Sequence, residues 1–144
     1  MGSEVEDFVQ ELQEQIYEET KAAYGEVVFE RWRNMRYMGT LDHPNGHGIL
    51  TGSCGDTMEI FLRFEGDRVA EARFRTDGCS STAVCGSFAA EAALGKSPDE
   101  LLDITGEAIL QRVGGLPKEE VHCATLAAEA LQEALNDYMV RQAG

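Results

Sequence analysis

The sequence has few positive charges and no long apolar run. Its 144 residues include 12 Lys and Arg against 26 Asp and Glu, which gives a formal net charge of −14 at pH 7. Nucleic acids and anionic membrane surfaces would repel such a protein, so we exclude both as partners. No segment is apolar enough to span a bilayer, and the N-terminus lacks the basic start and apolar core of an export signal. We therefore expect a protein of the reducing cytoplasm.

The four cysteines lack the paired spacing of a closed zinc site. They stand at positions 54, 79, 85 and 123, so no two of them form a Cys-x-x-Cys pair. In a reducing compartment, cysteines are ligands or reactive thiols more often than partners in disulfides. Structural zinc sites normally use paired cysteines, which fix two ligands on one turn. Any shared site must therefore be assembled by the fold, which suits a metal that can come and go.

Alternating side chains predict an antiparallel β-hairpin in the middle of the chain. Residues 57–64 and 68–76 both alternate between apolar and polar types, and Gly66 lies in the short loop between them. With the turn centred on Gly66, residue 57 faces about residue 75. The expected core side of the second run consists of Ala70, Ala72 and Phe74.

Two cysteines flank this hairpin. Cys54 precedes its first strand and Cys79 follows its second, so both thiols are expected at the same end of the sheet. The apolar run Gly48–Gly52 leads into Cys54 and predicts a further strand. Asp56 lies in the same turn as Cys54, and it places a carboxylate beside the thiols.

A helix rich in small residues is predicted at 83–94, where Gly95 ends it. Cys79 then lies at or just before a helix N-terminus, where the free N–H groups and the helix dipole favour the thiolate. Cys85 lies six residues later, about 120° around the helix from Cys79. We interpret Cys85 as a small buried apolar residue rather than a fourth ligand.

Helical spacing of apolar residues predicts helices on both sides of the strands. An acidic amphipathic helix comes first, and short helices begin at Ser97 and Thr105. A long last helix starts near Pro117, so that His122 and Cys123 fall in its first or second turn. The expected fold class is α+β: a three-stranded antiparallel sheet packed on several helices, with an additional N-terminal helix.

Two further groups of residues have a structural and a functional interpretation. His43 and His47 are either surface loop residues, which we favour because Pro44 argues against a helix there, or a metal-binding pair. Arg31, Arg33 and Arg36 form either a solvated face, which is the commoner case, or a docking patch for an acidic partner.

Three motifs occur in order along the chain: Gly52-Ser53-Cys54-Gly55-Asp56, Thr76-Asp77-Gly78-Cys79-Ser80-Ser81 and Val121-His122-Cys123. Together they resemble the IscU/NifU-type scaffolds of iron–sulfur cluster assembly. The resemblance covers about residues 24–138, and the spacing from Cys79 to Cys123 is similar to that of the IscU branch rather than the SufU-type sulfur acceptors. It implies an N-terminal acidic helix extension at 1–22 and a scaffold domain at 23–144.

The resemblance implies that Cys54, Cys79 and Cys123 are the cluster thiolates, with Asp56 or His122 at the fourth position. It also implies a scaffold rather than an enzyme, a [2Fe–2S] cluster as cargo, a cysteine desulfurase as sulfur source and iron–sulfur acceptor proteins as recipients. A carboxylate is a harder ligand than a thiolate, so a mixed ligand set should release the cluster more readily. The sequence leaves open whether the protein is a monomer or a homo-oligomer.

The chain departs from the family pattern shortly before His122. Family members commonly carry a Leu-Pro-Pro-Val-Lys run that a dedicated chaperone pair reads, whereas this chain has Leu116-Pro117-Lys118-Glu119-Glu120. The reversed charge argues against recognition by the chaperone pair and against a role for a lysine in cluster handling. An earlier segment, Arg33-Asn34-Met35-Arg36, also resembles the family, although Met35 stands where proline is usual.

Two other functions compete with the scaffold. Cys54, Asp56, Cys79 and Cys123 could also hold tetrahedral Zn²⁺, either as a structural zinc site or as a zinc-binding sulfur acceptor. A thiol-dependent enzyme would need a Cys–His pair, but neighbouring residues on a helix point about 100° apart, so His122 and Cys123 are poorly arranged for proton transfer.

Overall fold

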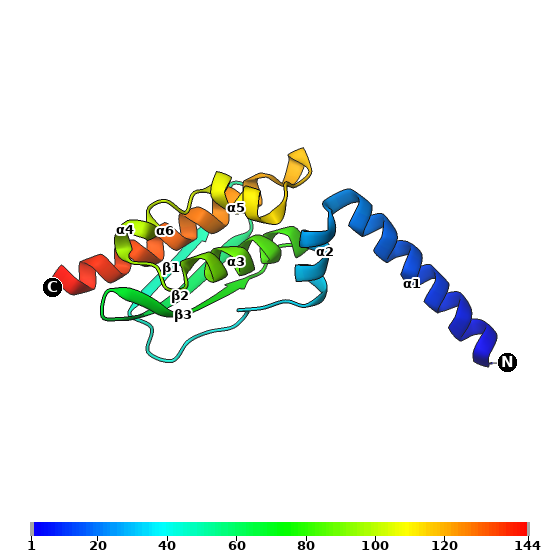
Figure 1. Cartoon of the computed structure of the whole chain (residues 1–144), viewed down its shortest axis with the longest axis horizontal. Helices are drawn as coiled ribbons and strands as arrows, with labels where there is room; N and C mark the ends of the chain where they lie inside the picture. The colour runs from blue at the N-terminus through cyan, green and yellow to red at the C-terminus, as the bar shows by residue number, and fades with distance from the viewer. Residues whose placement is uncertain (1, 144) are drawn as a thin grey trace.

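The computed structural model describes residues 2–143, and it has the predicted α+β fold with a three-stranded antiparallel sheet, helices against it and an N-terminal helix (Figure 1). Across these residues, no helix combines the length and the apolar character needed to cross a membrane. The elements in chain order are α1 (Gly2–Tyr24), α2 (Glu26–Arg33), β1 (Gly46–Thr51), β2 (Thr57–Glu65), β3 (Arg68–Thr76), α3 (Ser80–Ala93), α4 (Pro98–Leu101), α5 (Gly106–Val113), the 3₁₀ turn η1 (Lys118–Glu120) and α6 (His122–Ala143).

The sheet has the order β1-β2-β3, and the predicted hairpin forms its β2–β3 half. The predicted register is wrong by two residues, because Arg75 pairs with Glu59 rather than with residue 57. The turn consists of Gly66 and Asp67, and an irregularity in the pairing between Arg63 and Phe64 adds a further residue to the β3 side. A β-bulge of this kind reverses the side-chain alternation beyond it.

The bulge corrects the predicted core side of β3. Val69 pairs with Phe64 and is buried, whereas Ala70 has no partner in the ladder and is exposed. Ala72 and Phe74 are buried as predicted. The conclusion drawn from the hairpin is unaffected, since β2 still begins and β3 still ends at the same edge of the sheet.

Helices α3 and α6 cover one face of the sheet, with α6 lying along β1 and α3 along β3 (Figure 1). Gly48 permits the close approach of α6, because a Cβ there would lie 2.6 Å from the carbonyl oxygen of Ala130. The buried side of the sheet packs against small residues of both helices, which include Ala89, Ala93, Ala127 and Ala134. This packing fixes the start of α3 and the start of α6 near the edge of the sheet where Cys54 lies.

The predicted boundaries of two helices shift in the structure. Helix α3 starts at Ser80, three residues before the prediction, and α6 starts at His122, because Lys118–Glu120 forms a separate 3₁₀ turn. Cys79 is the N-cap of α3 and Cys123 lies in the first turn of α6, as predicted. Both thiols are thereby held at helix N-termini.

Arg31 was expected on the surface, and it is buried instead, with 3% of its surface exposed. Its guanidinium donates to Ser87 Oγ at 2.9 Å and to Glu91 Oε1 at 3.0 Å, and it lies 3.9 Å from the centre of the Phe88 ring. A buried cation needs such partners. Arg31 therefore joins α2 to α3, while the other two arginines of the predicted group are exposed.

Candidate functional site

The turn between β1 and β2 presents Cys54. The N–H of Gly52 donates to the carbonyl oxygen of Asp56 at 2.8 Å, and the N–H of Gly55 donates to that of Gly52 at 3.0 Å. Gly55 has φ = 92°, which a residue with a side chain rarely adopts. The tight turn leaves Cys54 exposed and the Asp56 side chain directed toward the start of α3.

The segment between β3 and α3 is tied to the same edge of the sheet. Asp77 Oδ1 accepts a hydrogen bond of 2.8 Å from the N–H of Thr57, which holds the end of β3 against the start of β2. Gly78 permits a close approach, since a Cβ there would lie 2.8 Å from Asp56 Oδ2. Cys79 follows directly and is exposed.

The hydroxyl of Thr82 connects three of the five predicted site residues. It donates to Asp56 Oδ2 at 2.9 Å, and it lies 3.2 Å from Cys123 Sγ and 3.6 Å from Cys79 Sγ. Its single proton goes to one of these groups at a time, so a hydrogen bond to either thiolate replaces the one to Asp56. Thr82 is completely buried in the first turn of α3.

The sequence reasoning did not identify Thr82 as part of the site. A usable signal was present, namely a hydroxyl residue three positions after Cys79, a spacing that brings the two side chains close once the helix starts at Cys79. The sequence did not indicate that Asp56 and Cys123 would also contact Thr82.

The two thiols beside Thr82 differ in acidity. Partial burial raises the pKa of Cys79, but hydrogen bonds from the Thr82 N–H, the Thr82 hydroxyl and the Ser81 N–H outweigh it, so the pKa lies below its ordinary value. For Cys123, burial raises the pKa to about 11, and the Thr82 hydroxyl opposes only part of that rise. Cys79 is therefore the readier nucleophile at neutral pH.

The remaining predicted site residues face a neighbouring hollow. Cys54 and His122 both line a cavity of about 380 Å³, together with Leu126. His122 Nε2 lies 3.8 Å from Cys123 Sγ, so His122 connects this cavity with the residues around Thr82. Within residues 2–143, no group of three or more His, Cys, Asp or Glu side chains is arranged closely enough to hold a metal ion as it stands. Coordination by three or four of these residues would therefore require their side chains to rearrange.

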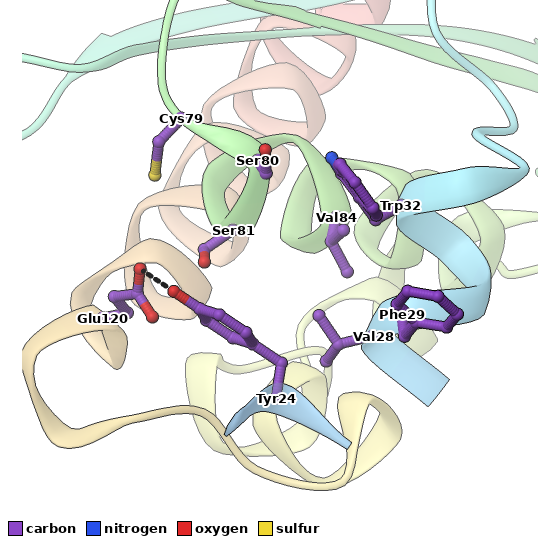
Figure 2. Close-up of a pocket in the computed structure, with 9 residues that line it drawn as sticks. All are labelled: Tyr24, Val28, Phe29, Trp32, Cys79, Ser80, Ser81, Val84 and Glu120. Atoms are coloured by element: carbon purple, nitrogen blue, oxygen red, sulfur yellow. Dashed lines mark hydrogen bonds between the residues drawn. The ribbon is translucent and has the colours of Figure 1, made fainter. Parts of the chain in front are cut away.

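A second cavity, of about 250 Å³, has Cys79 in its wall (Figure 2). Tyr24 and Glu120 form part of its wall, and the Tyr24 hydroxyl donates to Glu120 Oε1 at 3.0 Å. This hydrogen bond and burial raise the pKa of Tyr24. Glu120 Oε2 is buried without a partner among the described residues. Glu120, whose charge is opposite to that of the lysine common in the family, is thus held near Cys79 by Tyr24 at the end of α1.

The other cysteine and the histidine pair are structural. Cys85 is fully buried, which confirms the interpretation made from its helical position, and burial raises its pKa. His43 is exposed in a loop as predicted. The placement of His47 in that loop was wrong: it lies in β1, where Nε2 is 2.6 Å from Glu59 Oε2 and the ring stacks on Phe61. The two histidines do not share a site.

Comparison with known proteins agrees with this architecture. The sequence model of the family described as "NifU-like N terminal domain" matches residues 23–144. The chain is 38% identical over 116 residues to iron-sulfur cluster assembly scaffold protein IscU 1 of Archaeoglobus fulgidus, covering 80% of this chain and 76% of that protein. It is 34% identical over 122 residues to the scaffold protein IscU of Aquifex aeolicus, covering 83% and 78%.

The fold is also similar to that of a solved structure. The crystal structure of the N-terminal part of a nitrogen-fixing NifU-like protein from Brucella abortus matches with a TM-score of 0.66 at 18% identity. The match covers 85% of this chain and 98% of that one. At this identity the likeness concerns the fold alone.

Proposed function

The chain belongs to the family of NifU-like N-terminal domains, and on this premise we propose that it is a scaffold on which a [2Fe–2S] cluster is assembled and from which the cluster passes to acceptor proteins. The observation that carries the proposal is the Thr82 hydroxyl, which lies within 3.6 Å of Asp56, Cys79 and Cys123 at once. These residues come from three separate segments of the chain. Only the folded domain brings them together.

In this proposal Cys54, Cys79 and Cys123 supply thiolates to the cargo, and Asp56 or His122 takes the fourth position. Thiolates hold iron–sulfur clusters well, whereas the carboxylate and the imidazole are weaker partners for iron in this form. The exposed Cys54 turn supports a site that can open. A ligand set of this kind favours release of the cluster as well as its formation.

Sulfur would arrive as a persulfide from a cysteine desulfurase. A scaffold thiolate attacks the outer sulfur of the donor persulfide, the sulfur–sulfur bond of the donor breaks, and the donor leaves as a thiolate. The transferred sulfur is then a persulfide on the scaffold, and its conversion to sulfide consumes two electrons from an external reductant. The scaffold site contributes the attacking thiolate and the side chains that bind iron.

Zinc is the second candidate cargo, and the same donor set favours it. Cys79, Cys123, Asp56 and Cys54 match the sulfur and oxygen ligands of tetrahedral Zn²⁺, which would make the protein a zinc-binding sulfur acceptor or a structural zinc protein.

The η1 turn is acidic, because it contains Glu119 and Glu120. We therefore expect that the chaperone pair does not act on this scaffold.

Anaerobic reconstitution tests the proposal. Incubation with ferrous iron, cysteine, a reductant and a cysteine desulfurase should give visible absorption and acid-labile sulfide in the wild type. Cys54→Ala, Cys79→Ala and Cys123→Ala should abolish both signals, whereas Cys85→Ala, the matched control, should keep them because Cys85 is buried away from the solvent. Full cluster loading in all three variants would refute the ligand assignment, and zinc without sulfide in anaerobically purified protein would favour the second candidate.

The role of Asp56 has its own test. Asp56→Cys replaces a hard ligand with a soft one, so transfer of a preformed cluster to an acceptor should become slower. The measurement is the transfer rate followed by the acceptor's visible circular dichroism. An unchanged rate would place Asp56 outside the ligands of the cluster.

A further inference from the structure

Helix α1 carries an apolar stripe that no described residue covers. The stripe consists of Val5, Phe8, Val9, Leu12 and Ile16, and between 47% and 65% of the surface of each of these residues is exposed. Spacings of three and four residues place them on one side of the helix. Isolated exposed apolar residues are ordinary, but a continuous stripe over three turns marks an interaction surface. We call these five residues the apolar stripe.

The domain holds α1 by a different side. The Tyr17 ring contacts those of Phe29 and Trp32, with centres 5.7 Å and 6.2 Å apart, and Arg33 lies 4.8 Å from the centre of the Tyr17 ring. Tyr17 follows Ile16 and is therefore about 100° around the helix from it. Helix α1 is thus anchored at its C-terminal part, while the rest of the helix extends from the body of the molecule (Figure 1). The hollow between α1 and α2 is lined on the α1 side by Tyr17 and polar residues, and by no member of the stripe.

The charges along α1 define what can cover the stripe. Lys21 is its one basic residue, and two copies of this helix packed together would bring many like charges close. A groove with an apolar floor and Lys or Arg at its edges would complement the helix instead. The acidic residues are Glu4, Glu6, Asp7, Glu11, Glu14, Glu18 and Glu19.

The position of α1 shows where such a partner would stand. The helix ends at Tyr24, whose hydroxyl is bonded to Glu120, and Tyr24 lines the same cavity as Cys79 (Figure 2). A protein held on the stripe is therefore held at the end of the domain where the thiols lie. Because α1 rises about 1.5 Å per residue, the stripe begins about 12 Å from Tyr24, and the partner's reactive group must reach across that distance to the cavity.

We propose that α1 is a docking helix for the sulfur donor, whose apolar groove, edged by Lys and Arg, receives the apolar stripe. The inference rests on the proposed scaffold function and names a contact outside the thiol site. A cluster with two sulfides needs two separate deliveries, and a tether that keeps the donor nearby raises its effective concentration for the second one. An acceptor protein needs only one encounter for each cluster.

The test compares two single substitutions in the same exposed part of α1. Phe8→Ser removes the central aromatic ring of the stripe, and Gln10→Ser, the matched control, introduces the same residue outside it. The probe is the cysteine desulfurase of the same organism, and its dissociation constant is measured by calorimetry with the full chain. We expect Phe8→Ser to weaken binding about tenfold and Gln10→Ser to leave it unchanged. Added salt should weaken binding of the wild type, because the acidic borders of the stripe contribute to it.

Three results would overturn the inference. Equal affinity of Phe8→Ser and the wild type would show that the donor does not use the stripe. Sedimentation that shows a wild-type dimer lost in Phe8→Ser would assign the stripe to a second copy, and weakened binding to an acceptor but not to the desulfurase would assign it to the acceptor. Far-ultraviolet circular dichroism checks that both variants keep α1, and Ile16→Ser replaces Phe8→Ser if they do not.

Failure of the scaffold function would be recognised separately. With ferrous iron and inorganic sulfide, which need no protein donor, the wild type and Phe8→Ser should form equal amounts of cluster. A wild type that forms none would reject the proposed function whatever the affinity for the desulfurase. A wild type that forms cluster while both proteins bind the donor equally would reject only the docking role of α1.

Discussion

Helices α1 and α6 have nearly equal length, 23 and 22 residues, but they relate to the core in opposite ways. Most apolar side chains of α6 are buried against β1, α3 and α5, and only those near its C-terminus are exposed, whereas the whole apolar stripe of α1 is exposed. Helical spacing is present in both. The difference shows that periodicity determines that a helix forms, while the neighbouring elements determine whether its apolar side becomes core or surface.

Two leucine substitutions give the largest expected effect on this comparison. Leu131 in α6 is completely buried, so Leu131→Ala should lower the free energy of unfolding by about 2–5 kcal/mol through lost contacts and a cavity. Leu12 in α1 is 47% exposed, and Leu12→Ala should cost less than about 0.5 kcal/mol. Urea unfolding measures both. Equal losses would mean that the stripe of α1 is covered in solution.

Cys79 at the start of α3 and Cys123 at the start of α6 extend the comparison between an exposed and a buried position to chemical reactivity. Cys123 has 1% of its surface exposed and a pKa raised to about 11, whereas Cys79 is exposed with a lowered pKa. In the metal-free protein at pH 7.5, iodoacetamide should therefore modify Cys79 at least about tenfold faster than Cys123. Mass spectrometry of timed samples gives both rates.

The pH dependence of the two modification rates provides the control for that experiment. Because the pKa of Cys79 is below its ordinary value, its rate should level off at a lower pH than that of a free cysteine, while the rate at Cys123 should still rise toward pH 11. Cys85 should react most slowly. Similar rates and pH profiles at Cys79 and Cys123 would contradict the environments described for them.

Removal of α1 has the smallest expected effect on stability. We propose that residues 1–22 are an extension separable from 23–144, and their deletion should lower the melting temperature by only about 4 °C or less, because little buried surface is lost. The deletion keeps Tyr24 and its bond to Glu120. Calorimetry compares the two proteins, with Tyr24→Phe as a control for that bond. A truncated protein that no longer unfolds cooperatively would make α1 part of the domain.

The hairpin and its flanking cysteines could be predicted because they depend on local pattern. Alternation and Gly66 specify the strands and the turn, and they bring Cys54 and Cys79 to one edge. The bulge that exposes Ala70 could not be predicted, because it follows from how Val69 packs opposite Phe64. Burial of Arg31 likewise depends on the acidic and hydroxyl partners that α3 supplies from distant positions.

The assignment of Cys54, Asp56, Cys79, His122 and Cys123 to the candidate site stays a prediction, and the sequence did not indicate how they are arranged. The helix N-terminus at Cys79 follows from the small residues after it, and the buried Cys85 follows from its angle on that helix. Three other features join segments far apart in the chain: the contacts of Thr82 with Asp56 and Cys123, the hollow lined by Cys54 and His122, and the Tyr24–Glu120 bond. Such contacts depend on how the helices pack on the sheet.

The amino-acid sequence by itself determined the strands, the helices, the acidic charge and which side chains are candidate ligands, since these depend on side-chain chemistry and short-range spacing. The tertiary structure alone decided which thiol is buried and which is exposed, which carboxylate lies beside them, and which of two similar helices remains uncovered. The physical reason is that burial and acidity depend on atoms supplied by other segments, and those atoms are placed only when the sheet and its two helices have packed together.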